Sequence, residues 1–314
     1  MDARMNICAM NASTMSASDF TVWMSAQQAQ VEARLSRWVP AEVPAGLGEA
    51  MRYAVLDGGK RLRPLLVLAA CEAVAGHAEA ALRAACAVEL IHAYSLVHDD
   101  MPCMDNDVLR RGKPTVHVRY GQAMALLAGD ALQALAFELL TPAVDTDANV
   151  PAAMQAHLCG LLARAAGADG MAGGQAIDLA SVGQRLNEAE LRHMHELKTG
   201  ALLQTSVRMG VACGLDVPAQ VAAALGDYGA ALGLAFQVVD DVLDVTADSA
   251  VLGKTAGKDA AADKPTYVSV LGLQASQNLA AQLSAQAHRA LDASGLPQVA
   301  HLRALADWVV NRTH

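Results

Sequence analysis

Two groups of aspartates lie in an otherwise apolar sequence. The first, in HDDMPCMDND, includes Asp99 and Asp105, and the second, in FQVVDDVLD, includes Asp240 and Asp244. Because Asp240 and Asp244 are four residues apart, a helix would place both carboxylates on one face, where they repel each other unless a cation lies between them. Both groups are therefore candidate cation sites.

The first group needs a break in its helix. Asp99 and Asp105 are six residues apart, which no straight helix aligns. Pro102 cannot donate a backbone N–H and disfavours helix at Met101, so the helix should end or kink there and bring Asp105 back towards Asp99. Oxygen ligands without nearby Cys or paired His suit a hard cation, and few carboxylates per site suit Mg²⁺, which shares its coordination with phosphate. Either group alone is more simply a solvated helix end, but the two together favour several Mg²⁺ ions with a diphosphate between them.

A basic motif, LDGGKRLRP, supplies a second kind of anion site. Its two glycines should end the preceding helix with a left-handed cap. Lys60 and Arg63 would then enter the next helix at its first turn, where exposed backbone N–H groups favour an anion. The motif therefore predicts a diphosphate site.

Two adjacent arginines follow the first aspartate group. Arg110 and Arg111 provide planar donors that match phosphate oxygens. The alternative is that they only pair with Asp105 and Asp107.

The composition favours helices to position these groups. The chain has 314 residues, of which 54% are hydrophobic and only 4% aromatic, and Ala and Leu are abundant. We expect almost no sheet. A net charge of −9 argues against a nucleic-acid partner, because a phosphate backbone is bound by a basic face.

The cellular setting follows from the cysteines and from charge within the apolar stretches. The six cysteines form no CxxC pair, which fits a reduced cytoplasm. Charged residues such as Glu89, Asp130 and Glu138 interrupt the most apolar stretches, so we expect no membrane span.

His193 and His195 point apart on a helix, so we expect them at the surface rather than at a metal. Residues 1–25 resemble a disordered leader, and one domain would occupy 26–314.

Helical patterns recur along the chain and predict a large all-α bundle. The segments 85–97 and 229–239 are apolar on all faces, which is typical of helices at the centre of a bundle. The segment 246–265 has no apolar periodicity and is long enough to be a functional loop. The ten expected helices are about 26–37, 44–57, 62–75, 80–101, 121–140, 151–168, 188–212, 218–245, 275–293 and 298–311.

Seven segments together give a specific resemblance. They are GGKRLRP, LIHAYSLVHDDMPCMDNDVLRRGKPT, GMAGGQAIDL, HELKTGAL, LGLAFQVVDDVLD, LGKTAGKD and DKPTYVSVLGL, in this order from about residue 45 to the C-terminus. The chain resembles the trans-prenyl diphosphate synthases, and most closely the bacterial farnesyl diphosphate synthases. The resemblance implies an all-α bundle of the isoprenoid synthase type around a central apolar cavity.

The resemblance also assigns roles to residues that match the family's motifs. It places Lys60, Arg63, His92 and Arg111 around the diphosphate of isopentenyl diphosphate. It implies Asp99, Asp105 and Asp240 as Mg²⁺ ligands, with Asp100 and Asp244 as further members of the two motifs. It places Arg110, Lys198 and Lys254 at the allylic diphosphate, Thr199 and Gln237 beside its first carbon, and Lys264 as the late lysine of a mobile loop. The implied catalytic set is Asp99, Asp100, Asp105, Arg110, Lys198, Thr199, Gln237, Asp240 and Lys254.

The implied activity is a head-to-tail condensation. Isopentenyl diphosphate would react with dimethylallyl or geranyl diphosphate in the presence of Mg²⁺. The resemblance also implies three Mg²⁺ ions per site, which Mn²⁺ could replace, and a homodimer. Asn106 departs from the acidic run of many relatives, but the metal-binding aspartates remain. Gln175 and Asp178 resemble the family's GQ-x-x-D segment and would support the metal or a lysine, whereas an N-cap is the structural alternative for Asp178.

Product length would be set one turn below Asp99. Ser95 is too small to stop a growing chain, and Tyr94 matches the position that forms the floor in farnesyl synthases. An ordinary core aromatic is the alternative for Tyr94. Geranyl and geranylgeranyl diphosphate synthases, a class I terpene cyclase and a silent partner subunit are the other functions considered.

Overall fold

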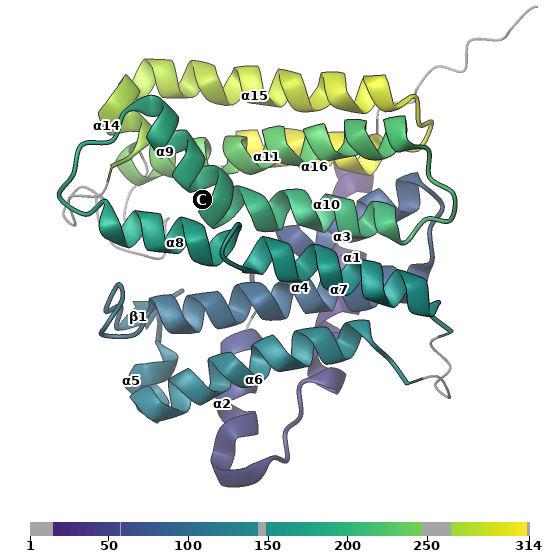
Figure 1. Cartoon of the computed structure of the whole chain (residues 1–314). Coiled ribbons are helices and arrows are strands. Elements are labelled where there is room, and N and C mark those ends of the chain that lie inside the picture. Colours follow the sequence, from purple (N-terminus) through teal and green to yellow (C-terminus); the bar gives the residue numbers. More distant parts are fainter. Residues whose placement is uncertain (1–14, 57, 144–148, 247–264, 313–314) are drawn as a thin grey trace, which may run out of the picture.

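The computed structural model describes residues 15–56, 58–143, 149–246 and 265–312, which are almost entirely helical (Figure 1). In chain order the elements are α1 (Ala17–Trp38), η1 (Pro44–Gly46), α2 (Leu47–Val55), α3 (Leu62–Ala73), α4 (Ala78–Asp99), β1 (Leu109–Arg110), β2 (Lys113–Pro114), α5 (Val116–Tyr120), α6 (Gln122–Leu140), α7 (Ala152–Ala166), α8 (Met171–Ala180), α9 (Glu188–His195), η2 (Glu196–Gly200), α10 (Ala201–Ala212), α11 (Ala219–Thr246), α14 (Tyr267–Leu271), α15 (Leu273–Ser294) and α16 (Ala300–Asn311). The predicted all-α fold is confirmed. In the described part of the chain the only sheet is the antiparallel β1–β2 hairpin.

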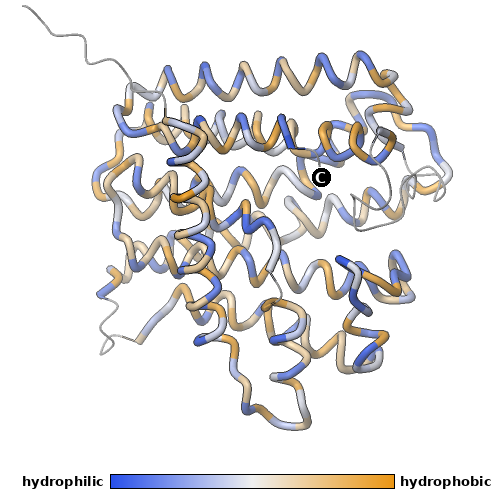
Figure 2. Tube along the Cα trace, turned by 180° about the vertical axis from the view of Figure 1, so that it is seen from behind, coloured by the Kyte–Doolittle hydropathy of each residue, from blue (hydrophilic) through white to orange (hydrophobic). Residues whose placement is uncertain are grey.

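The helices form a bundle built around α4 and α11. Most of them run side by side across the view, and α1 crosses them (Figure 1). The helix α4 packs mainly against α6 and α3, whereas α11 packs mainly against α15 and α10. Figure 2 shows hydrophilic and hydrophobic residues alternating along the outer helix α15, while α4 is buried and apolar over most of its length. The C-terminal ends of α4 and α11 lie at the same end of the bundle, near β1 and α14 (Figure 1).

Two glycines allow close helix contacts around η2. A Cβ on Gly174 of α8 would overlap the backbone of Lys198. On the other side, a Cβ on Gly233 of α11 would lie 3.0 Å from the Cα of Gly200. Because neither glycine carries a side chain, α8 and α11 can hold η2 closely between them.

Several predicted boundaries differ from the structure. The helix α1 begins at Ala17, because the Ser16 side chain accepts a hydrogen bond from the backbone N–H of Asp19 and caps the helix. The predicted leader 1–25 is therefore wrong for residues 17–25, and residues 1–14 lie outside the described chain. The helices α5, α8 and α14 were not expected: α5 and α14 are five residues long, and α8 begins in a Gly-rich segment.

Three helices are long and apolar enough to cross a membrane, judged by length and composition alone. They are α4, α6 and α11, and 72%, 44% and 61% of their most apolar windows are buried inside the protein. Most of the window is therefore packed inside the protein in α4 and α11, but less than half of it in α6. The expected lack of a membrane span stays a prediction.

Candidate active site

The first aspartate group folds back on itself as Pro102 predicts. The helix α4 ends at Asp99, and the chain turns so that the backbone N–H of Asp105 donates to the carbonyl of Asp99 at 2.8 Å. Asn106 supports this turn with a positive φ of 51° and a hydrogen bond to the Met101 carbonyl. The predicted approach of Asp105 to Asp99 is confirmed.

Asp99 is the most strongly perturbed carboxyl of this group. Burial raises its pKa from 3.8 to about 6; Lys198 opposes the shift and Asp105 adds to it. A cation bound here would lower the cost of ionising Asp99. The local charge therefore fits the predicted metal ligand.

Arg110 makes a two-pronged ion pair with Asp100. Its Nη2 and Nε atoms donate to the two Asp100 oxygens at 2.6 and 2.9 Å, and Asp100 is only 3% exposed. Burial favours a lower pKa for Arg110, but the Asp100 pair outweighs it and the net shift is upward. Asp100 thus fixes the Arg110 guanidinium beside the first aspartate group.

The basic loop gathers several cations in one place. Burial lowers the pKa of Arg63 and of Lys60, and Asp240 acts in the opposite direction on both. Burial also lowers the pKa of His92 well below its usual range, helped by Arg63 and Arg111. The Nε atom of Arg63 is buried and has no hydrogen-bond partner. Such crowding of cations is what an anion subsite requires.

The loop geometry differs in one detail from its prediction. Because α3 begins at Leu62, Arg63 lies in the first helical turn as expected, whereas Lys60 lies before the helix. Arg111 donates to the Gly58 carbonyl at 2.8 Å. Gly59 has a φ of 130°, and a Cβ there would lie 2.8 Å from the Arg111 guanidinium. The second glycine thus makes room for Arg111 as well as for the turn.

A π-helical turn carries Lys198 and Thr199. The segment predicted as one helix, 188–212, is α9, the wide turn η2 and α10. The Lys198 ammonium donates to Asp178 at 2.6 Å, and the Thr199 hydroxyl donates to Gln237 Oε1 at 3.1 Å. Gln237 in turn donates to Asp241 at 2.8 Å. The expected support of a lysine by Asp178 is confirmed.

A cavity of about 360 Å³ connects these groups. Asp99, Lys198 and Thr199 line it together with Tyr94 and Ser95. Helix α8 adds an apolar wall from Met171, Ala172, Ala176 and Leu179. Charged groups and an apolar space that could hold a hydrocarbon chain therefore share one cavity.

The second aspartate group contains a contact that the sequence did not predict. The Arg312 guanidinium donates to Asp240 at 2.7 Å and to the Phe236 carbonyl at 2.8 Å, and its side chain is 3% exposed. Asp244 is buried. Arg312 is 72 positions away from Asp240 in the sequence, so no local pattern could reveal the contact.

The carboxylates do not form a closed metal site among the described residues. No group of three His, Cys, Asp or Glu side chains there is arranged to hold an ion. The donor set still fits Mg²⁺, because this ion usually takes one or two carboxylates and completes its shell with water and phosphate. Lys254 and Lys264 lie outside the described residues.

His195 corrects a smaller expectation. It is 6% exposed and stacks on the ring of Tyr267 with centroids 5.5 Å apart, whereas His193 is exposed. Burial lowers the pKa of His195 to about 4. The surface assignment is therefore wrong for His195.

Known proteins resemble the chain over nearly its whole length. A family model described as polyprenyl synthetase matches residues 44–298. Large subunit 1 of the chloroplastic heterodimeric geranylgeranyl pyrophosphate synthase of Arabidopsis thaliana is 45% identical over 300 residues, which cover 95% of this chain and 80% of that protein. A probable farnesyl diphosphate synthase of Bradyrhizobium diazoefficiens is 49% identical over 275 residues, which cover 86% and 81%. The geranyltransferase of Helicobacter pylori, crystallised with magnesium and isoprenyl diphosphate, matches with a TM-score of 0.81 and 34% identity over 93% of this chain and 98% of that one.

The helical bundle and these relatives define the chain as a prenyltransferase of isoprenoid biosynthesis. It belongs to the polyprenyl synthetase family.

Proposed function

We propose that the protein condenses isopentenyl diphosphate with dimethylallyl or geranyl diphosphate, giving farnesyl diphosphate and free diphosphate. The observation that carries the proposal is the cavity in which Asp99 and Lys198 share walls with Tyr94. Allylic ionisation needs charged groups at the diphosphate, and chain growth needs an apolar space beside them.

In this proposal the two aspartate groups hold Mg²⁺. Asp99, Asp105 and Asp240 would bind the ions, and Asp100 and Asp244 are further members of the two aspartate groups. The bound ions would neutralise the negative charge of the departing diphosphate. We expect three Mg²⁺ ions at the site, and we expect Mn²⁺ to be able to replace them. Asp240 would exchange its Arg312 partner for metal.

The protein's own side chains act at two diphosphates. Lys60, Arg63, His92 and Arg111 would bind the diphosphate of isopentenyl diphosphate, which stays attached through the reaction. Arg110 and Lys198, with Lys254 from the segment outside the described residues, would bind the allylic diphosphate and stabilise the charge that grows as its C–O bond breaks. Lys264, also outside the described residues, would be a further substrate-binding lysine.

The carbocation would form beside Thr199 and Gln237. The Thr199 hydroxyl donates a hydrogen bond to Gln237, so the lone pairs of its oxygen are available to face positive charge. The apolar wall from α8 keeps water away while the isopentenyl double bond attacks. The proton lost from the new chain would pass to the released diphosphate.

Tyr94 supports a fifteen-carbon product. It lines the cavity next to Ser95, its ring lies edge-on to His98 with centroids 5.7 Å apart, and its hydroxyl accepts a hydrogen bond from Gln133 at 3.4 Å. These contacts hold a large ring at the wall of the space where a prenyl chain would grow. A twenty-carbon product is the second candidate, since the Arabidopsis relative is named a geranylgeranyl synthase subunit.

Other functions fit the site less well. A terpene cyclase has no need of a second diphosphate subsite, which the Lys60 and Arg63 loop would provide. A silent partner subunit has no need of intact aspartate groups.

We propose that a second copy of the chain covers α5 and α6. Val118, Leu126 and Leu127 are 49%, 47% and 53% exposed, and α6 is the least buried of the long apolar helices. We also propose a single catalytic domain in the cytoplasm, which fits the buried free thiols of Cys71, Cys86 and Cys213.

Mass spectrometry of the products tests the proposed function. The purified protein is incubated with isopentenyl diphosphate, Mg²⁺ and either dimethylallyl or geranyl diphosphate. Farnesyl diphosphate as the main product supports the proposal, and geranylgeranyl diphosphate supports the second candidate. No elongated product with either substrate contradicts both.

A further inference from the structure

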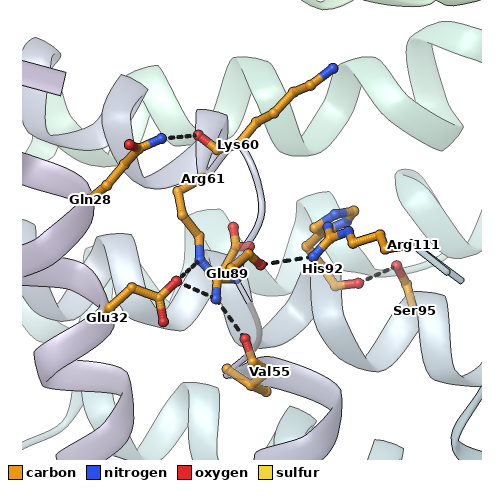
Figure 3. Close-up of polar contacts among 10 residues, drawn as sticks. Gln28, Glu32, Val55, Lys60, Arg61, Glu89, His92, Ser95 and Arg111 are labelled. Carbon is orange, nitrogen blue, oxygen red and sulfur yellow. Dashed lines mark hydrogen bonds and ion pairs between the residues drawn. The ribbon is translucent and has the colours of Figure 1, made fainter. Parts of the chain in front are cut away.

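Arg61 is the most completely bonded residue of the basic loop. Its guanidinium contacts three separate elements: Glu32 of α1 at 2.6 Å, Glu89 of α4 at 2.7 Å and the Val55 carbonyl at the end of α2 at 2.6 Å (Figure 3). Its side chain is only 3% exposed. Arg61 therefore points into the protein, away from any diphosphate bound by Lys60 and Arg63.

The backbone of Arg61 is strained to allow this. Its φ is 49°, in the left-handed region that a residue with a side chain rarely adopts. The conformation persists because the buried ion pairs hold the side chain, and because Gln28 of α1 donates to the Lys60 carbonyl at 3.0 Å (Figure 3). The contacts of Arg61 thus determine where its neighbours Lys60 and Arg63 emerge.

Glu89 is the buried anion in this crowd of cations. It is 3% exposed and lies one helical turn before His92 on α4. Burial lowers the pKa of Arg63 and of Arg111, and Glu89 is the strongest influence in the opposite direction on both. Although burial also acts to lower the pKa of Arg61, Glu89 and then Glu32 reverse that shift. One carboxylate therefore stabilises three guanidinium groups.

We propose that Arg61 and Glu89 are a positioning pair for the isopentenyl diphosphate subsite. Glu89 attaches the basic loop to α4 through Arg61, and its negative charge keeps Arg63 and Arg111 close together before a diphosphate binds. Neither residue is placed to touch the substrate. The inference rests on the proposed function, because that function names the ligand of the subsite.

The first variant is Glu89→Gln, which keeps the shape and an oxygen acceptor for Arg61 but removes the charge. We expect the KM for isopentenyl diphosphate to rise by about tenfold or more, because Arg63 and Arg111 then lose the buried charge that holds them together. The KM for the allylic substrate and kcat should stay within about threefold of the wild type. Calorimetric titration with isopentenyl diphosphate alone should show the same loss of affinity.

Variants at Arg61 test whether the pair acts as a unit. Arg61→Met should raise the same KM, and adding Glu89→Gln to it should raise the KM little further, since the two groups share one interaction. Arg61→Lys keeps a charge for Glu89 but not the three-way contact, so its KM should fall between the wild type and Arg61→Met. Additive effects of the two single changes would contradict the pair.

The matched control is Glu79→Gln. Glu79 pairs with Arg34 of α1 and with Arg83, so it links the same two helices outside the subsite. A purely structural role for Glu89 predicts a lower melting temperature in both glutamine variants with no change in KM, and that result overturns the proposal. If the wild type neither binds nor consumes isopentenyl diphosphate, the proposed function fails instead. If Glu89→Gln does not fold, the KM of Arg61→Lys for isopentenyl diphosphate, compared with that of the wild type, tests the proposal instead.

Discussion

Replacing Asp99 with Asn should stabilise the protein without metal while it destroys turnover. Burial raises the pKa of Asp99 from 3.8 to about 6. Because the folded-state pKa is the higher one, Asp99 favours the folded state when protonated, and this contribution is lost as the pH rises through about 6. At about 1.36 kcal/mol per pKa unit, the ionised carboxylate costs about 3 kcal/mol of unfolding free energy at pH 7.5.

The pH dependence gives the sharper measurement. With these two pKa values, the unfolding free energy of Asp99→Asn relative to the wild type should increase by about 1.4 kcal/mol between pH 5 and pH 7.5. Urea unfolding followed by circular dichroism, in the presence of a chelator, measures this difference. Asp227→Asn, at an exposed site on α11, serves as the control for changing a charge.

Metal and activity complete the test. Mg²⁺ with diphosphate should raise the melting temperature of the wild type more than that of Asp99→Asn, because the variant lacks one ligand. Turnover of the variant should fall by about 10²-fold or more, the effect of losing one group that stabilises transition-state charge. An Asn variant whose stability relative to the wild type does not change with pH would refute the reasoning about Asp99.

Four further substitutions test the other parts of the site. Tyr94→Ala should cost about 2 kcal/mol of stability and lengthen the product beyond fifteen carbons, and chromatography of dephosphorylated products that still end at fifteen would contradict a floor at Tyr94. Arg63→Ala should raise the KM for isopentenyl diphosphate with little effect on kcat, whereas Arg110→Ala should lower kcat; steady-state kinetics with the reverse result would invert the two subsites. Asp178→Asn should release Lys198 and lower kcat by about tenfold, and an unchanged kcat would show that Lys198 needs no such support.

The helical fold and the first aspartate group could be predicted because their signals are local. Abundant Ala and Leu with few aromatics indicate helices, and Pro102 indicates the turn that brings Asp105 to Asp99. The start of α1 was missed because a polar first turn capped by Ser16 resembles a disordered segment. The helix α8 was missed because its glycines disfavour helix on their own, whereas close packing against η2 requires one of them.

The contacts that complete the site could not be predicted because they join distant residues. Arg312 reaches Asp240, and Arg61 reaches Glu89, through the packing of separate helices. The charge pattern of the sequence indicated that basic side chains and carboxylates would lie close together in the site, but not which basic side chain pairs with which carboxylate. Adjacent arginines illustrate the limit: Arg110 binds Asp100 while Arg111 turns to a backbone carbonyl.

The positions of Lys198 and Thr199 depend on the number of residues in the wide turn η2. A π-helical turn contains one residue more than the α-helical turn it replaces. Deleting a single residue from Glu196–Gly200 would allow a regular helix to run from α9 into α10 with the two flanking helices nearly in register, because the wide turn already absorbs the extra residue. The change would therefore fall on the side chains of the turn itself. Lys198 and Thr199 would then leave Asp178 and Gln237, although no chemical group had been altered. When segments of this chain are exchanged with those of its relatives, the residue count across this turn therefore has to be preserved as strictly as the identity of its lysine.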